Sequence, residues 1–451
     1  MTLLWIETTL EEIADIQTGS TPSKKNSQFY GGSFPLFKPG DLGSIYPLSY
    51  SDECLSDEGK AVARFIPANS TYVTCIGATI GKTGFVNVDA TCNQQINTLT
   101  PLGGIVPKLV FYWMISPQMN HQIINGSSST TMPIINKSRF SKLHCVLPPF
   151  AEQKVIADKL DTLLAQVETT KARLERIPEI LKSFRQSVLA AAVSGKLTEE
   201  WRKENEVLIE SWVSTNIGEL AQVATGKTPK RTISEYWDDG DIPWLTSAAT
   251  GDAITFEAEQ FVTKLAVKEC TLKLFPIGTL LLAMYGEGKT RGQVTELQLE
   301  ATCNQACAAI LVDETKVSKE FLKLRLQENY EETRKAAVGG AQPNLNLNKV
   351  REITVELPSE PEQIQIVCRV EELFVFADSI EQKATAALAR VNNLTQSILA
   401  KAFRGELTAE WRAANPELIS GDNSAAALLE KIKAERKTMK PVKKTRAKTA
   451  G

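Results

Sequence analysis

Apolar residues recur in alternating steps of four and three along two long stretches of the chain. The first series consists of Ile156, Leu160, Leu163, Val167, Thr170, Leu174, Ile177, Leu181, Phe184 and Val188, in which only Thr170 is polar. The second series, 210 residues further on, consists of Ile366, Val370, Leu373, Ala377, Ile380, Ala384, Ala387, Val391, Leu394 and Ile398. Such spacing is typical of helices that pack along a seam. It predicts two long helices, paired antiparallel as a coiled coil; two ordinary core helices are the alternative.

These two stretches belong to an internal duplicate, 147–202 and 357–412. Each copy opens with Leu-Pro and Glu-Gln and closes with Gly-x-Leu-Thr-x-Glu-Trp-Arg, and the offset is 210 residues at both ends. A constant length is what a spacer requires. Pro178 predicts a kink in the first helix, since proline removes a backbone hydrogen bond. Gly195 and Gly405 stand where a glycine commonly ends a helix.

The segments outside the long helices are also repeated, but their offset varies. Residues 13–22 return at 220–229, 90–94 at 301–305 and 133–136 at 343–346. Two variable domains therefore alternate with two constant helices. The predicted boundaries are 1–150 for the first domain, 151–210 for the central helical spacer, 211–357 for the second domain, 358–418 for the distal helical spacer, and 419–451 for a short helix and a basic tail.

Each variable domain combines short strands with amphipathic helices. Strand-like segments broken by glycine and proline lie at 70–76, 84–88, 278–284 and 307–312, and helical patterns lie near 108–124 and 317–337. The predicted fold class is α+β, with two small α/β domains joined by two long antiparallel coiled-coil helices in a pseudo-twofold internal repeat.

Composition is that of a folded protein. Of the 451 residues, 43% are hydrophobic and 23% charged. Apolar runs such as 109–115 are too short to span a bilayer, and residues 1–15 lack the pattern of a secretory signal, so we expect a cytoplasmic location. The eight cysteines form no C-x-x-C pair and there are two histidines, which gives zinc little support.

Charge is unevenly distributed although the net charge is only −2. Between residues 60 and 150 there are seven basic side chains, and Asp89 is the only acidic one. One face of the first domain is therefore expected to be positive, as in nucleic-acid-binding proteins. A second basic run consists of Arg436, Lys437, Lys440, Lys443, Lys444, Arg446 and Lys448. That run is either a solvated tail or a phosphate contact.

Loops rich in small polar residues, 126–133 and 339–344, lie between the second half of each domain and its long helix. Glutamine and asparagine in such loops can pair with base edges, while lysine and arginine contact phosphates. The predicted DNA-contacting residues are Lys82, Gln94, Gln95, Ser128, Thr130, Lys137 and Arg139 in the first domain, and Lys289, Arg291, Gln305, Gln342, Asn344 and Lys349 in the second. A solvated surface is the alternative role for each of them.

Catalytic motifs are approached but not completed. Residues 77–83 resemble a P-loop but are one residue short between the glycines, and a strand pattern follows them where a phosphate loop needs a helix. Leu147-Pro148-Pro149-Phe150 resembles the N-P-P-F/Y motif of adenine methyltransferases, but leucine replaces the asparagine. Neither a nucleophile elbow nor a nucleophile–base pair is evident. We therefore expect a non-catalytic chain that binds no cofactor or metal itself.

The motifs of the duplicate carry a family resemblance. The L-P-P-x-x-E-Q start at 147–153, its partner at 357–363, and the G-K-L-T-x-x-W-R and G-E-L-T-x-x-W-R endings resemble the conserved regions of type I restriction–modification specificity subunits. Residues 386–412 are especially similar to the family of the K enzyme (type IA). The resemblance implies two target recognition domains, each reading one half of a split DNA sequence. It also implies two methyltransferase and two restriction–translocase partners, which would carry S-adenosylmethionine, ATP and Mg²⁺.

The length of the helices agrees with that expectation. Residues 156–188 would form about 48 Å of helix at roughly 1.5 Å per residue, whereas major-groove sites on one face of DNA recur about every 34–36 Å. Helices of this size can hold two readers about one turn apart, so that helix length sets the spacer in the target. Two other hypotheses stay open: a self-sufficient DNA methyltransferase, and a duplicated coiled-coil scaffold without DNA contact.

Overall fold

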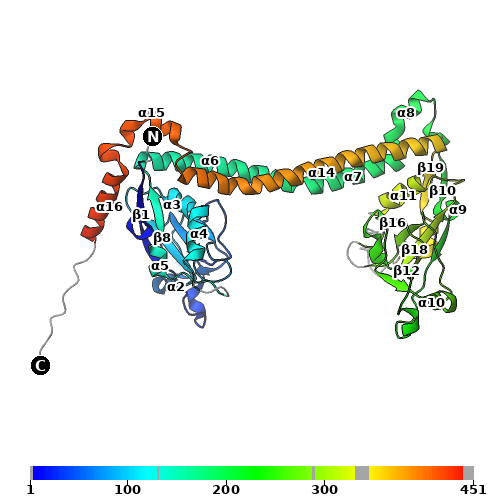
Figure 1. Ribbon diagram of the computed structural model, residues 1–451, viewed down its shortest axis with the longest axis horizontal. Helices are drawn as coiled ribbons and strands as arrows, with labels where there is room; N and C mark the ends of the chain where they lie inside the picture. Colours follow the sequence, from blue (N-terminus) through cyan, green and yellow to red (C-terminus); the bar gives the residue numbers. More distant parts are fainter. Residues whose placement is uncertain (1–3, 129–131, 287–289, 331–344, 440–451) are drawn as a thin grey trace. The chain divides into compact units, whose positions relative to one another are not determined.

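The chain is described by a computed structural model, which places residues 4–128, 132–286, 290–330 and 345–439 (Figure 1). It divides into two compact units. Unit 1 contains Met1–Glu175 and Ala386–Gly451, and unit 2 contains Arg176–Thr385. Each unit holds one mixed α/β domain and parts of the long helices. Among the placed residues, no helix is long and apolar enough to cross a membrane.

The first domain, in unit 1, is built on an antiparallel four-stranded sheet. Its order is β2-β8-β5-β6, and a smaller sheet β4-β3-β7 and the pair β1-β9 accompany it. The strands are β1 Ile6–Thr9, β2 Ala14–Thr18, β3 Tyr30–Phe37, β4 Cys54–Leu55, β5 Ser70–Thr74, β6 Thr83–Val86, β7 Thr91–Cys92, β8 Ile96–Pro101 and β9 His144–Leu147. Every residue of β5 and β6 is buried, although β5 contains one serine and two threonines.

Helices of unit 1 cover this sheet and close its core. They are α1 Leu10–Ile13, α2 Asp57–Val62, α3 Pro107–Met114, α4 Pro117–Asn125, α5 Lys137–Ser141, α6 Phe150–Glu175, α15 Ala409–Ala414 and α16 Ala425–Met439, with the end of α14 from Ala386. Six consecutive residues of α3, from Leu109 to Met114, are buried, so this helix forms the centre of the core. Short 3₁₀ turns are η1 Ser27–Phe29, η6 Pro416–Leu418 and η7 Gly421–Asn423.

The second domain, in unit 2, has the same sheet with one strand added. Its order is β11-β18-β15-β16-β13, beside a smaller sheet β14-β12-β17 and the pair β10-β19. The strands are β10 Val213–Asn216, β11 Ala221–Thr225, β12 Ile242–Leu245, β13 Ile254–Thr255, β14 Gln260–Val262, β15 Leu280–Ala283, β16 Val294–Leu297, β17 Thr302–Cys303, β18 Cys307–Val312 and β19 Thr354–Leu357. Strands β11 and β18 repeat the burial pattern of β2 and β8 residue by residue.

Helices of unit 2 are α7 Ile177–Val193, α8 Glu199–Glu204, α9 Ile217–Leu220, α10 Lys264–Glu269, α11 Lys319–Glu328, α13 Leu347–Arg351 and the first part of α14 Glu360–Phe403. The 3₁₀ turns are η2 Lys196–Thr198, η3 Ile209–Ser211, η4 Ser234–Tyr236 and η5 Ser247–Gly251. Figure 1 shows α14 as one unbroken helix.

The short strands predicted from the sequence are present, within a few residues, as β5, β6, β15 and β18. The helix predicted near 108–124 is two helices, because Ser116 caps α4 and Pro117 occupies its first turn. The helix predicted at 317–337 is present as α11, and the part of that prediction from residue 331 lies outside the placed residues.

The long helices break and end at the positions predicted from proline and glycine. The first one stops at Glu175 and resumes at Ile177 with Pro178 in its first turn, in agreement with the predicted kink. Both helices end at the expected glycines, whose φ angles are 76° at Gly195 and 75° at Gly405. In α14, Val370, Ala377, Ala384 and Val391 are buried at seven-residue steps, whereas Leu394 of the predicted seam is 45% exposed.

In each unit, the start of one duplicated helix packs with the end of the other copy. In unit 1, Ile156 and Leu160 of α6 share a buried cluster with Leu399 and Phe403 of α14. In unit 2, Val188 and Ala192 of α7 share a cluster with Ile366 and Val370 of α14. These clusters also contain residues of the adjacent domain, so the helices and the domain of one unit form a single core.

A buried carboxylate lies at the centre of the helix junction in unit 1. Glu152 is fully buried; Arg412 and Thr408 donate to its Oε1 at 2.5 and 2.6 Å, and Trp5 donates to its Oε2 at 2.8 Å. The second guanidinium nitrogen of Arg412 donates to the carbonyl of Gly405 at 2.6 Å. Because every oxygen of the carboxylate is bonded, its burial is compensated.

Unit 2 contains the same junction with the two helix copies exchanged. Arg202 and Thr198 donate to Oε1 of the buried Glu362 at 2.6 and 2.8 Å, and Trp212 donates to its Oε2 at 2.8 Å. Arg202 also donates to the carbonyl of Gly195 at 2.6 Å. The Glu of the opening motif and the Thr and Arg of the closing motif are therefore framework residues.

The glutamine of each opening motif ties the domain to its helix. Oε1 of Gln153 accepts from the backbone N–H of Val106 at 2.9 Å, immediately before α3. Oε1 of Gln363 accepts from the backbone N–H of Ser318 at 2.8 Å, immediately before α11. Each amide satisfies one of the free N–H groups at a helix start, and the duplicated long helices thereby help to orient α3 and α11.

Unit 1 carries an additional segment after its closing motif. Helix α16 buries Leu429 and Ile432 in the core of unit 1. Lys433 forms an ion pair with Glu12 of α1 at 3.2 Å, and Arg436 donates to the backbone carbonyl of Glu11. Helix α16 is thus folded against the first domain. The basic residues from Lys440 onward lie outside the placed residues.

Candidate nucleic-acid interface

Four strand ends meet at one edge of the first domain's sheet. The register pairs Thr18 with Asn97, Thr74 with Ile96, and Val73 with Thr83. The end of β2, the start of β8, the end of β5 and the start of β6 therefore lie along this edge. Loops that leave one sheet edge are held by the rigid strands and can present side chains to a ligand. We call this set of loops the loop edge of the first domain.

Most of the predicted first-domain residues lie on this loop edge. Gln94 and Gln95 stand just before β8, and Lys82 stands just before β6. The backbone N–H of Ile135 donates to the carbonyl of Cys75, which brings Lys137 and Arg139 of α5 to the end of β5. Ser128 belongs to the same group of loops, because its backbone pairs with Ile134.

The side chains at this edge are not equally available. Lys82 donates to the carbonyl of Gly40 at 2.9 Å, and Gln95 accepts from Asn93 at 2.9 Å. Lys137 and Arg139 are exposed, and within the described part of the chain their side chains have no bonding partner. The two α5 cations are therefore available for a ligand, whereas Lys82 already bonds to the loop that contains Gly40.

The second domain has the corresponding edge. The register pairs Thr225 with Ala308, Ala283 with Cys307, and Leu282 with Val294. Gln305 lies just before β18, and Arg291 lies in the turn before β16. Lys349 is exposed on α13, where Asn346 caps the helix as Asn136 caps α5. The predicted residues Lys289, Gln342 and Asn344, together with Thr130 of the first domain, lie outside the described residues.

Arg231, on the loop that follows β11, lies against two aromatic rings. The guanidinium of Arg231 lies 3.7 Å from the centre of the Trp237 ring and 5.0 Å from that of Trp244, and it donates to Gln260 at 2.5 Å. Stacking of this kind holds a cation without neutralising its charge. Arg231 is not among the residues predicted from the sequence, although a basic run, Lys227 to Arg231, directly follows the repeated Thr-Gly motif.

Some polar side chains of the two domains already bond to neighbouring side chains of the same domain. In the first domain, hydrogen bonds from Lys38 and then Lys24 keep the pKa of Glu53 below its ordinary value. In the second domain, a hydrogen bond to Glu269 raises the pKa of Tyr236 to about 12, so this hydroxyl stays protonated at neutral pH. The charges of Lys24 and Lys38 are therefore compensated in part by the carboxylate of Glu53.

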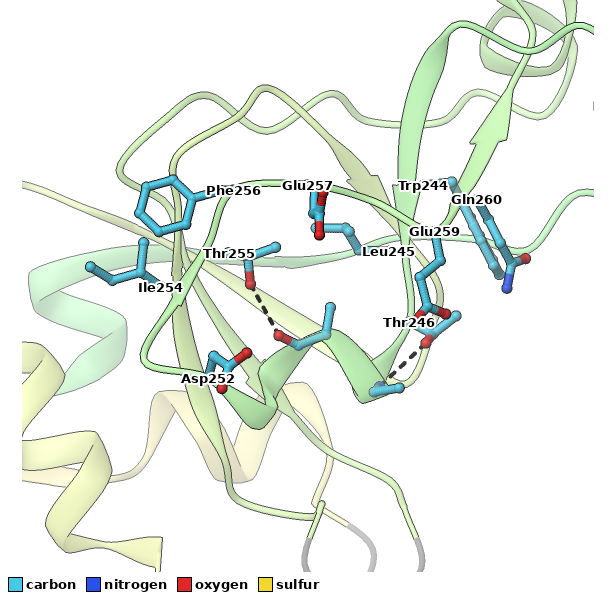
Figure 2. A pocket seen from close by; sticks show the side chains of 12 residues that line it. Trp244, Leu245, Thr246, Asp252, Ile254, Thr255, Phe256, Glu257, Glu259 and Gln260 are labelled. Carbon is cyan, nitrogen blue, oxygen red and sulfur yellow. Dashed lines mark hydrogen bonds between the residues drawn. The ribbon is translucent and has the colours of Figure 1, made fainter. Parts of the chain in front are cut away.

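A cavity of about 310 Å³ borders the loop edge of the second domain (Figure 2). The carbonyl of Leu245 in its wall accepts from the backbone N–H of Asn304, next to Gln305. Three exposed carboxylates line the cavity, Asp252, Glu257 and Glu259, beside the 72% exposed ring of Phe256. This lining disfavours a phosphate but can accept hydrogen bonds from an amino group such as cytosine N4.

Metal chemistry finds no support in the part of the chain that is placed. There, no three His, Cys, Asp or Glu side chains come together as a metal site would require. The buried residues Glu152 and Glu362 are occupied by arginine, threonine and tryptophan in the two junctions. Both glutamates are motif residues in the sequence, but this role was not predicted for them. The matching Glu, Thr and Arg positions of the duplicate were the available signal.

Comparison with known proteins agrees with this geometry. The family model of the type I restriction modification DNA specificity domain matches residues 3–179 and 209–390. The StySPI specificity subunit of Salmonella potsdam is 39% identical over 79% of this chain and 78% of its own length. The EcoDI specificity subunit of Escherichia coli is 40% identical over 76% of this chain and 79% of its own length.

Solved structures show the same fold. The HsdS subunit of Thermoanaerobacter tengcongensis matches with a TM-score of 0.61 at 17% identity, over 90% of this chain and 98% of that one. A chain from a structure of type I R-M complex assembly matches with a TM-score of 0.67 at 17% identity, over 89% and 98%. The chain therefore belongs to the family of type I restriction–modification specificity subunits, which are the non-catalytic, DNA-recognising components of their complexes.

Proposed function

We propose that each domain reads one half of a bipartite, asymmetric DNA target. The observation that carries this proposal is the contrast between framework and loops: the junctions around Glu152 and Glu362 are the same, whereas the loop edges carry different side chains. Equivalent helix junctions that carry different DNA-facing loops suit a target whose two halves differ in sequence. The exposed cations Lys137, Arg139 and Lys349 would supply the sequence-independent phosphate contacts.

We further propose that the conserved helices pair as an antiparallel coiled coil with pseudo-twofold symmetry and set the spacer of the target. The buried heptad of α14, Val370, Ala377, Ala384 and Val391, supports the pairing. Each unit joins the start of one helix copy to the end of the other, as antiparallel pairing requires. A spacer set in this way depends on the number of helical residues and not on their surface side chains.

The expected partners follow from family membership. Double-stranded DNA, two methyltransferase subunits and two restriction–translocase subunits would complete the complex in the cytoplasm. S-adenosylmethionine, ATP and Mg²⁺ would be held by those subunits, and adenine methylation and restriction would occur there. This chain would contribute binding and orientation of the DNA.

The methylome of a host without other methyltransferases tests the proposal. The host expresses a cognate methyltransferase subunit with or without this chain, and modified adenines are mapped by sequencing. We expect methylation only in the presence of the chain, at a split motif with unlike halves. Methylation that ignores which chain is supplied, or none despite an assembled complex, would contradict the proposal.

Substitution of the exposed cations distinguishes DNA recognition from the alternative of a scaffold without DNA contact. In Lys137→Ala combined with Arg139→Ala, DNA reading predicts weaker binding and a shallower salt dependence, because two phosphate contacts are lost. A scaffold without DNA contact predicts no change. Lys431→Ala, an exposed lysine of α16, is the matched control.

A further inference from the structure

Both domains carry the same small construction at the loop edge. The repeated motif Thr-Gly-x-Thr-Pro, residues 18–22 and 225–229, follows β2 and β11. It crosses the repeated turn Cys-Asn-Gln, residues 92–94 and 303–305, which precedes β8 and β18. The rest of each loop edge differs between the domains, so a construction kept in both has a shared task.

Glycine allows the two segments to cross in contact. A Cβ atom on Gly19 would lie 2.2 Å from the carbonyl oxygen of Asn93, and one on Gly226 would lie 1.6 Å from that of Cys303. Any larger residue would push the segments apart. The crossing therefore fixes the position of each Thr-Pro segment against the following glutamine.

A threonine hydroxyl then orients the glutamine side chain. Oγ1 of Thr21 donates to Oε1 of Gln94 at 2.9 Å, and Oγ1 of Thr228 donates to Oε1 of Gln305 at 2.6 Å. Both glutamines are exposed. Within the described part of the chain, the NH₂ groups of these two amides have no bonding partner, so each remains a hydrogen-bond donor in a restricted orientation.

A cation is held beside each pair by different means. In the first domain, Arg64, which follows α2, donates to the carbonyl of Thr18. In the second domain, Lys227 of the loop donates to the carbonyl of Cys270 and to Oγ1 of Thr271, which follow α10, at 3.3 and 2.6 Å. Both cations bond to uncharged oxygens, so their positive charge is retained next to the oriented amide.

We propose that Gln94 and Gln305 are base-reading residues and that Thr21 and Thr228 position them. The amide NH₂ would donate to an acceptor on a base edge in the major groove, such as purine N7 or guanine O6. Arg64 and Lys227 would meet the adjoining phosphate. This inference rests on the proposed function, since it names the site at which each domain reads its half of the target.

Methylomes of single variants of the full chain test it. Gln94→Leu and Gln305→Leu remove the donor at nearly constant size, and each is expressed with the methyltransferase subunit beside the wild-type chain. We expect Gln94→Leu to relax one position in one half of the motif, with a loss of discrimination of about 5- to 100-fold there, while the other half stays unchanged. Gln305→Leu relaxes the opposite half, so each variant is the other's control.

Positioning is tested by Thr21→Val and Thr228→Val, which remove the hydroxyl but keep the branched shape. We expect relaxation at the same base position as in the matching glutamine variant, to a smaller extent. Gln222→Leu, an exposed glutamine of β11 away from the turn, should leave the motif unchanged. Thermal midpoints of the purified variants should equal that of the wild type, because the replaced side chains are exposed or, in the case of Thr21, only partly buried.

The outcomes separate the inference from the proposed function. An unchanged motif in both glutamine variants, beside an active wild-type chain, overturns the inference and leaves the proposed function intact. Equal loss of methylation in both halves, or a lowered thermal midpoint, would show that the pair only holds the loop together and also overturns it. If the wild-type chain directs no methylation, the proposed function fails and the inference fails with it.

Discussion

The two helix junctions differ in how the chain connects them and agree in how they bond. In unit 2, the chain runs directly from Arg202 to Trp212, and both residues bind Glu362. In unit 1, the corresponding residues Arg412 and Trp5 come from opposite ends of the sequence and bind Glu152. The same bonds form with and without covalent continuity. The junction is therefore specified by its side chains, and the motifs that reveal the family are framework rather than DNA-reading residues.

Unit 1 contains an additional helix, α16, whereas unit 2 contains a covalent connection between Arg202 and Trp212. Helix α16 packs Leu429 and Ile432 into the core and places Lys433 on Glu12 of α1. In unit 2 the chain between Arg202 and Trp212 joins the helix to the domain covalently. The comparison suggests that α16 serves as a noncovalent replacement for that linker.

Removing the buried carboxylates should have the largest effect on stability. Glu152→Ala leaves Arg412, whose side chain is only 11% exposed, without its ion partner, and Glu362→Ala does the same to the buried Arg202. We expect each variant to lose about 3–5 kcal/mol, the usual cost of breaking a buried ion pair, as measured by denaturant unfolding. Similar losses in the two variants would confirm that the junctions are equivalent.

The matched control for this pair is Glu406→Gln. Glu406 bonds to Arg404 at 2.6 Å, but its side chain is 50% exposed. The expected loss is small beside that of the junction variants, because water and salt screen an exposed ion pair. If the junction variants lost no more than this control, the junctions would not hold the units together.

Shortening Ile432 in α16 should weaken unit 1 selectively. Ile432 is 2% exposed, and Ile432→Ala is expected to cost about 2–5 kcal/mol through lost burial and the remaining cavity. Hydrogen exchange should show reduced protection in β1, α1 and α16 of unit 1 and unchanged protection in unit 2. Equal loss of protection in both units would contradict the role assigned to α16; Lys431→Ala on the exposed face is the control.

A smaller, pH-dependent difference is expected in the second domain. Burial would raise the pKa of Glu296, but hydrogen bonds from Lys319 and Lys323, at 2.9 and 3.2 Å, outweigh it and lower the pKa. A carboxyl whose pKa is lower in the folded state stabilises the fold above its ordinary pKa of about 4.3. That contribution disappears as the pH falls through the folded pKa.

Glu296→Gln tests this. Between pH 7 and pH 3, the thermal midpoint of the wild type should fall more steeply than that of the variant, because only the wild type loses the ion pairs on acidification. Parallel curves would show that Lys319 and Lys323 contribute nothing at neutral pH.

The sequence predicted the framework well because its residues obey short-range rules. The heptad spacing of α14, the helix-ending glycines and the break at Pro178 depend on backbone geometry and on neighbours one or two turns away. The break between α3 and α4 was missed, although Ser116-Pro117 is a strong start signal for a helix. The hydrophobic pattern across residues 108–124 hid it.

The candidate site was predicted less completely, because it depends on contacts between distant segments. Residue type and repetition selected Gln94 and Gln305, but not their partners Thr21 and Thr228, which lie more than seventy residues away in sequence. The same limit applies to Glu152, whose partner Arg412 is 260 residues away. Repetition of both partners in each copy was the signal available, and pairing them required the register of the sheets.

Exchange of the two domains within one chain tests the central claim most directly. Residues 7–147 and 214–357 would change places, so that Trp5, Trp212 and both junctions are kept. Lys433 would also keep a partner, because Glu219 accepts from Thr215 in the second domain as Glu12 accepts from Thr8 in the first, both at 2.6 Å. The chimera is expressed with the methyltransferase subunit, and its methylome is compared with that of the wild type.

If the two helix junctions are related by pseudo-twofold symmetry, exchanging the two domains is equivalent to binding the same DNA in the opposite orientation. The account therefore predicts that the chimera methylates the same bipartite motif with the same spacer as the wild type. An assembled chimera that methylates a motif with another spacer, or none, would contradict it and show that the two helix junctions are not equivalent.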